Sequence, residues 1–332
     1  MTFDPRGSVE ESAGQIVQLP DGTDFAKGEV GALQSLLVSK IVEERNPLKY
    51  AEIFRIAGQN PAATPWMRFA CWAEDINGRR RAKGADLPAI ADELDRFVRE
   101  ASEGLPMNSH KYLLLGGASW NIAIVRRNIR LYANAAAAQR QSSAWYGLAG
   151  NVPQQLVCIF AAQVEEVTAA FVEDDEEAIR RSVLALIAAR DHILYALPEY
   201  PVWMQQNAMI HIAWPLVMIA AAYPDIAFPP LDWRNYSEDF ARAKAGVPQW
   251  AKVFHLWDEY VREQYAEVVG QEPVDLPSSS ADNAAFTVQI LRALAERKLG
   301  RAAQAEERLQ AVAGHQGLDG GIPIAVAKKL LS

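Results

Sequence analysis

The stretch Asn283–Ala313, NAAFTVQILRALAERKLGRAAQAEERLQAVA, decides the fold because two helical patterns meet within it at a glycine. The first pattern ends at Leu299–Arg301, and the second places Ala305, Leu309 and Val312 on one helical face. A glycine commonly ends a helix because it adopts a left-handed backbone conformation at no steric cost. The stretch therefore predicts a helical hairpin.

Apolar residues recur at helical spacing through most of the remaining chain, and no segment shows the alternation typical of a strand. We therefore predict an all-α fold of stacked antiparallel helical hairpins, either α-solenoid-like or an irregular helical bundle. Besides a helix that begins at residue 65, the predicted helices cover residues 30–44, 48–56, 88–101, 120–141, 152–171, 178–197, 236–245 and 249–269.

Composition suggests four segments along the chain. Residues 1–28 are rich in Gly, Asp, Glu and Ser, which favours a flexible N-terminal arm. Residues 29–270 form the expected main helical domain. Residues 271–281 contain two prolines and three consecutive serines, as a linker does, and residues 282–332 follow as a C-terminal helical hairpin.

Six prolines lie between residues 198 and 230 and predict short helices joined by surface loops. Trp203, Trp214 and Trp233 fall in or next to this region. A tryptophan on a surface loop can anchor a partner or line a pocket. The alternative is that these rings only pack the irregular loops together.

Charge and composition indicate which class of partner the protein binds and in which cellular compartment it lies. The formal net charge of −8 disfavours nucleic acid and anionic membrane and favours a basic protein partner. The most apolar run, residues 212–223, is too short to span a bilayer, and the N-terminus has no signal-peptide pattern. Cys71 and Cys158 lie in apolar helical patterns, as buried free thiols do. We expect a cytoplasmic protein.

The run Glu173–Glu177, EDDEE, is the sharpest chemical feature. Consecutive carboxylates suit Mg²⁺, and class I terpene cyclases use such a run to hold it, but only the weak variant Glu-Asp-x-x-Glu is present. The alternative is that these acids lie in the first turn of a helix, where the helix dipole favours them. The five histidines show no metal-ligand spacing, so we expect no metal and no cofactor. The candidate binding face consists of Asp174, Asp175, Glu176, Glu177, Asp258 and Glu259.

Gly116–Ser119 precedes an expected helix start at Trp120, and we interpret it as a glycine turn with a serine cap, or as a small anion-binding nest. Arg126 and Arg130 are one helical turn apart, which predicts that they share a face. They form either a clamp for a phosphate or carboxylate, or a set of ion pairs within the protein.

The segment Leu299–Val312 resembles the turn and second helix of a tetratricopeptide repeat. Gly300, Ala305 and Leu309 occupy the turn, the small and the bulky inward positions of that family. The resemblance covers about half a repeat and implies stacked helices that bind another protein.

The segment Ala185–Asp191, ALIAARD, which follows the acidic run, resembles the all-α immunity proteins of bacterial toxin systems, in particular the family called immunity protein 49. That resemblance implies a protein that blocks a toxin and has no catalytic activity.

The leading expectation is therefore a cytoplasmic helical protein that binds a protein partner, with toxin neutralisation as a specific form. The alternative is a Mg²⁺-dependent enzyme of the class I terpene-cyclase type with a pocket between helices. A regulatory domain that binds a small ligand fits the sequence as well.

Overall fold

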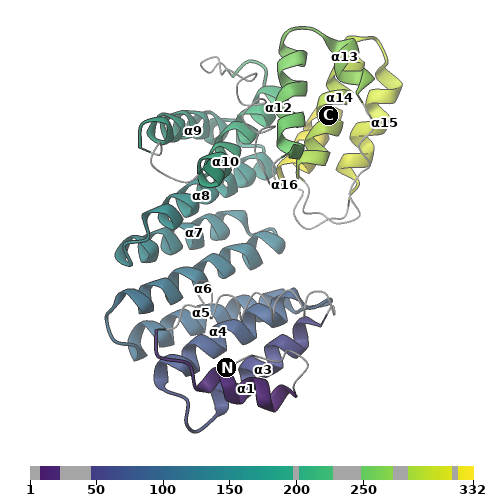
Figure 1. Ribbon diagram of the computed structural model, residues 1–332. Coiled ribbons are helices and arrows are strands. Elements are labelled where there is room, and N and C mark those ends of the chain that lie inside the picture. Colours follow the sequence, from purple (N-terminus) through teal and green to yellow (C-terminus); the bar gives the residue numbers. More distant parts are fainter. Residues whose placement is uncertain (1–7, 23–45, 197–201, 227–247, 272–282, 316–320) are drawn as a thin grey trace. The chain divides into compact units, whose positions relative to one another are not determined.

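The computed structural model describes residues 8–22, 46–196, 202–226, 248–271, 283–315 and 321–332. These residues form fourteen α-helices and contain no strand, so the predicted all-α fold is confirmed (Figure 1). The helices are α1 (Val9–Val17), α3 (Pro47–Gln59), α4 (Pro65–Arg81), α5 (Leu87–Gly104), α6 (Ser109–Asn128), α7 (Tyr132–Leu148), α8 (Val152–Glu173), α9 (Glu176–Ala196), α10 (Val202–Ala222), α12 (Pro248–Val261), α13 (Tyr265–Gly270), α14 (Asn283–Lys298), α15 (Ala302–Ala313) and α16 (Gly321–Leu331).

The helices cluster into two compact units. The first unit comprises residues 1–129 and 137–158, and the second comprises residues 130–136 and 159–332. The division falls within α7 and α8, and α14–α16 belong to the second unit rather than forming a unit of their own. The predicted linker lies almost entirely outside the described residues, and so do the predicted helices over 30–44 and 236–245.

The first unit is built from successive antiparallel helices, in which α3 packs on α4, α4 on α5 and α5 on α6. Proline at the first turns of α3, α4 and α5 follows an Asn, Thr or Asp whose side chain caps the helix. Gly78 on α4 faces α3, where a methyl group would lie only 2.9 Å from the Ala51 nitrogen and the Pro47 oxygen. The absence of a side chain at Gly78 therefore sets the close approach of these two helices.

Helix α1 lies in the segment that we predicted to be a flexible arm, so that prediction is wrong for residues 9–17. The Ser8 Oγ accepts a hydrogen bond from the Glu11 N–H at 3.1 Å, and the Ser8 N–H donates to the Glu11 carboxylate at 2.9 Å. This capping box satisfies backbone donors at the start of the helix. Ile16 is fully buried, and α1 packs on α3.

Helix α6 runs unbroken through Gly116, so the predicted glycine turn and anion-binding nest over Gly116–Ser119 are wrong. The Gly116 carbonyl accepts a hydrogen bond from the Ser142 Oγ at 2.7 Å, and the Tyr146 ring lies 3.0 Å from where a Cβ would be. Ser119 is fully buried and caps nothing. The glycine serves close packing against α7, and the real break follows α6, at Arg130, whose φ is 64°.

Helix α14 is the centre of the C-terminal part of the second unit. It contacts α10, α12, α13, α15 and α16, and every residue from Ala284 to Glu296 is buried. The predicted hairpin is present: Gly300 has φ 75° after α14, and Ala305, Leu309 and Val312 of α15 are fully buried. Helix α16 is a third helix beside this hairpin, and we did not predict it.

Helix α10 is one continuous helix with Pro215 inside it, so the predicted break into short helices and surface loops is wrong for residues 202–222. Trp214 is 5% exposed, and its Nε1 donates to the Thr287 Oγ1 at 3.0 Å. Trp214 is therefore a core residue and not a surface anchor. The Trp203 side chain and all of Trp233 lie outside the part that the structure describes.

Candidate functional site

The acidic run Glu173–Glu177 forms the connection between α8 and α9, which we call the acidic turn. Asp174 ends α8 with a φ of 51°, and the Asp175 carboxylate caps α9 by accepting the Ala178 N–H at 2.9 Å. Glu176 and Glu177 lie in the first turn of α9, where the helix dipole stabilises negative charge. The local sequence thus places these acids by ordinary helix capping.

Three cations of the same unit pair with acids of the turn. Glu176 pairs with Arg180 at 2.5 Å, Glu177 with Arg181 at 3.4 Å, and Asp174 with Lys329 at 2.8 Å. All five residues of the turn are nevertheless exposed. Since five carboxylates face three cations, the turn keeps an excess of negative charge.

The acidic turn does not assemble a metal centre with its surroundings. Within the described ranges, no three His, Cys, Asp or Glu side chains are grouped as a metal ion would require. A carboxylate-bound Mg²⁺ needs several oxygen ligands that converge on one point. The geometry of the turn therefore favours the helix-capping interpretation of its acids.

Asp258 and Glu259, which we grouped with the acidic run, are not exposed as that run is. Asp258 is partly buried, and its carboxylate pairs at 3.1 Å with Arg262, which follows the end of α12. Glu259 is buried, lies 3.0 Å from the His255 Nε2, and has a raised pKa, chiefly because burial disfavours its charged form. Glu259 is therefore a poor candidate for an exposed binding face.

Arg126 and Arg130 do not share a helix face, so the arginine clamp that we predicted there is not formed. The Arg126 guanidinium pairs with Asp95 of α5 at 2.6 Å, as the ion-pair alternative predicts. Helix α6 ends at Asn128, and Arg130 lies in the left-handed turn after it, so the helical spacing of the two arginines does not apply. Arg130 instead lines a pocket in the second unit.

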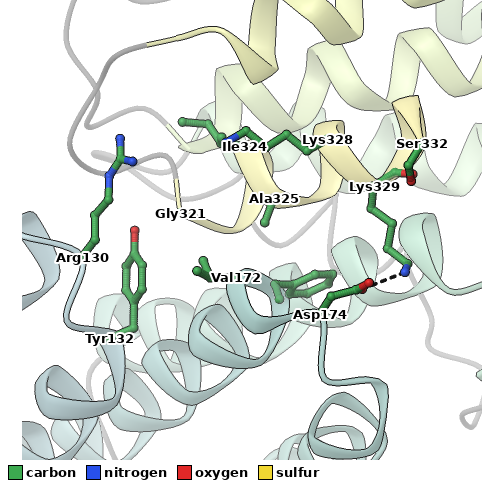
Figure 2. Close-up of a pocket in the computed structure, with 11 residues that line it drawn as sticks. Arg130, Tyr132, Val172, Asp174, Gly321, Ile324, Ala325, Lys328, Lys329 and Ser332 are labelled. Atoms are coloured by element: carbon green, nitrogen blue, oxygen red, sulfur yellow. Dashed lines mark hydrogen bonds and ion pairs between the residues drawn. The ribbon is translucent and has the colours of Figure 1, made fainter.

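This pocket, of about 350 Å³, lies within the second unit and is shown in Figure 2. One side comes from the chain before and at the start of α7 and from the end of α8, and the other side from α16. The lining residues are Arg130, Tyr132, Phe171, Val172, Asp174, Gly321, Ile324, Ala325, Lys328, Lys329 and Ser332. We refer to it as the α8–α16 pocket.

A polar network closes one end of the α8–α16 pocket. The Asp174 carboxylate accepts hydrogen bonds from the Lys329 Nζ at 2.8 Å and from the Tyr223 hydroxyl at 2.9 Å (Figure 2 draws the first). The Lys329 bond, followed by the Tyr223 bond, lowers the pKa of Asp174, and the same bond to Asp174 raises the pKa of Lys329. Burial, with the neighbouring Asp174, raises the pKa of Tyr223 to about 12.

Gly321 begins α16 at the other end of the pocket. A Cβ there would lie 2.6 Å from the Thr168 Cγ2 and 2.9 Å from the Tyr132 hydroxyl oxygen. The glycine thus lets α16 approach α8 and the start of α7. Sequence reasoning missed this pocket because α8 and α16 are about 150 residues apart and no local pattern pairs them; the paired Lys328 and Lys329 were its only visible sign.

Comparison of the chain with protein-family models, with curated proteins and with solved structures gave no match. The class of the protein is therefore defined by its fold only: it is an all-α protein of packed helical hairpins. In the described part of the chain, α8 is the one helix long and apolar enough to cross a membrane, and 56% of its most apolar window is buried within the protein. Core helices have the same composition.

Proposed function

We propose that the chain is a cytoplasmic helical protein that binds a basic protein partner, and that the acidic turn forms part of the contact surface. The observation that supports this most is the exposure of five consecutive carboxylates, which pair with three cations among the residues that the structure describes. Such an excess attracts a positively charged surface and speeds its association.

The outward face of α9 extends this surface. Glu177, Arg181, Leu184 and Ala188 are exposed at helical spacing, and Leu184 is 71% exposed. An apolar side chain next to charged groups matches the pattern of interfaces, where a buried apolar centre supplies affinity and a polar rim supplies selectivity. The proposed surface is therefore the acidic turn together with Leu184 and Ala188.

Toxin neutralisation is the specific form of binding that we propose. Its support is the resemblance of Ala185–Asp191 to immunity proteins, since this segment belongs to the same helix as the exposed face. An inhibitor of this kind needs a complementary surface and no catalytic group.

The test is cross-linking capture in the native host with two matched variants of the full chain. Glu173→Gln/Glu176→Gln/Glu177→Gln removes charge from the acidic turn, and Glu306→Gln/Glu307→Gln removes charge from exposed positions on α15. Exposed ion pairs contribute only about 0–1 kcal/mol, so both variants should fold, which circular dichroism checks.

We expect the wild type and the α15 variant to capture the same basic protein and the acidic-turn variant to lose it. Capture that is equal for all three proteins, or a captured partner that is acidic, would contradict the proposal.

A further inference from the structure

The α8–α16 pocket has an unusual charge balance for so acidic a protein. Among its lining side chains, three are cationic, Arg130, Lys328 and Lys329, and one is a carboxylate, Asp174, so the side chains carry a net charge of +2. Lys329 is already paired with Asp174. The side chains of Arg130 and Lys328 make no hydrogen bond or ion pair with any residue that the structure describes, so two positive charges are left for a ligand.

The wall between these cations is apolar. Phe171 and Tyr132 are buried there, Ile324 also lines the pocket, and Ala325 points from α16 toward the side that carries Val172 (Figure 2). Val172 is 55% exposed although it lines the pocket, so water contacts an apolar side chain there. A hydrocarbon group that covers Val172 would remove this apolar surface from water, which is favourable.

The volume of about 350 Å³ is at the small end of the range of ligand sites, which is roughly 300–1,000 Å³. A pocket of this size fits one small molecule with an acidic group and a short apolar body. A guanidinium suits a carboxylate because it can donate two parallel hydrogen bonds.

We propose that the α8–α16 pocket binds a small organic carboxylate. The carboxylate group pairs with Arg130 and Lys328, and the hydrocarbon body lies against Val172 and Phe171. The pair of Asp174 and Lys329 closes one end and disfavours a second negative group there. This site shares Asp174 with the acidic turn, but its two unpaired cations, Arg130 and Lys328, lie outside that turn, so separate variants test the two proposals.

The first experiment measures binding to the full chain by isothermal titration calorimetry. The probes are three carboxylates with different bodies, namely hexanoate, 4-phenylbutyrate and indole-3-acetate. 4-Phenylbutan-1-ol tests the need for charge, and inorganic phosphate tests the need for an apolar body. We expect at least one carboxylate to bind at one site with a Kd below about 1 mM, and the alcohol and phosphate to bind at least about tenfold more weakly.

Matched variants then locate the site. Arg130→Gln/Lys328→Gln should weaken carboxylate binding at least about tenfold, and Ala325→Leu should abolish it by filling the pocket. Lys298→Gln, which removes an exposed charge at the end of α14, should leave the Kd unchanged. Arg130 and Lys328 are exposed, so their variant remains informative even if Ala325→Leu unfolds.

Failure of all three carboxylates to bind would overturn the proposal, and so would equal binding to wild type and to Arg130→Gln/Lys328→Gln. The Glu173→Gln/Glu176→Gln/Glu177→Gln variant should bind the carboxylate at least as tightly as the wild type, because it keeps Arg130 and Lys328 and removes only negative charge near the pocket. The two proposals can therefore fail separately, because one variant tests carboxylate binding in the pocket and the other tests protein docking at the acidic turn.

Discussion

Gly78 shows how one missing side chain sets the distance between two helices. A methyl group there would lie 2.9 Å from backbone atoms of Ala51 and Pro47, which cannot rotate away. We expect Gly78→Ala to lower the free energy of unfolding by about 1–3 kcal/mol in urea denaturation. Gly14 on α1 has open space around it, so Gly14→Ala should leave stability unchanged or raise it by up to about 1 kcal/mol. Equal effects of the two substitutions would refute this account of α3–α4 packing.

Asp174 couples folding to pH through its bonds from Lys329 and Tyr223. Because its pKa is lowered on folding, Asp174 stabilises the protein above the ordinary aspartate pKa of about 4, and this stabilisation is lost as pH falls through the lower folded value. We expect Asp174→Asn to lower the melting temperature at pH 7 and to have little effect near pH 2. A melting-temperature difference that is the same at both pH values would argue against this role.

At alkaline pH the same network loses stability as the pH rises, whereas at acid pH it loses stability as the pH falls. Lys329 and Tyr223 both have a raised pKa, so their stabilisation is present at neutral pH and is lost as pH rises through the folded values. Ultraviolet titration should show one tyrosine that ionises at about 12, and Asp174→Asn should lower its midpoint. An unchanged midpoint would mean that burial alone raises the pKa of Tyr223.

At the scale of elements, α15 packs on α14 through Ala305, which is fully buried. We expect Ala305→Leu to overfill this contact and to lower the free energy of unfolding by about 1–3 kcal/mol in denaturant titration. Ala303 is exposed on the same helix, so Ala303→Leu should change stability by less than about 0.5 kcal/mol. If both variants unfold at the same denaturant concentration, the claim that α15 packs closely on α14 at Ala305 is wrong.

Elements whose signals are local could be predicted from the sequence. Gly300 and the stripe Ala305, Leu309 and Val312 fully define the hairpin of α14 and α15. The capping box Ser8–Glu11 was also a readable signal for α1, and the composition of the surrounding segment concealed it. Gly116 and Pro215 were misinterpreted, because each is accommodated inside a helix by tertiary packing that no local pattern records.

One part of the candidate site could also be predicted from the sequence, and the other part could not. The acidic turn could be predicted because its five acids are consecutive and the last two lie in the first turn of α9. The α8–α16 pocket could not be, because Asp174 and Lys329 are 155 residues apart and meet only through packing of the second unit. Arg130 was identified for the wrong reason, since it lines the pocket from a turn and not from the face of α6.

At the scale of the whole molecule, the chain has a net charge of −8, and the two sites that we propose in the second unit differ in their local charge. The acidic turn presents negative charge to the solvent, whereas the α8–α16 pocket gathers cations. The account therefore predicts two separable ligands, a basic protein and a small organic carboxylate.

The central claim is that the acidic turn recruits a basic protein. The most direct test is the association rate constant between the full chain and the captured partner, measured at about 50 mM and about 500 mM salt, since screening shortens the reach of exposed charges. We predict that the wild-type rate falls at least about tenfold at high salt, and that Glu173→Gln/Glu176→Gln/Glu177→Gln is slow at both salt concentrations. A wild-type rate that does not depend on salt, or one that the three substitutions leave unchanged, would contradict the claim.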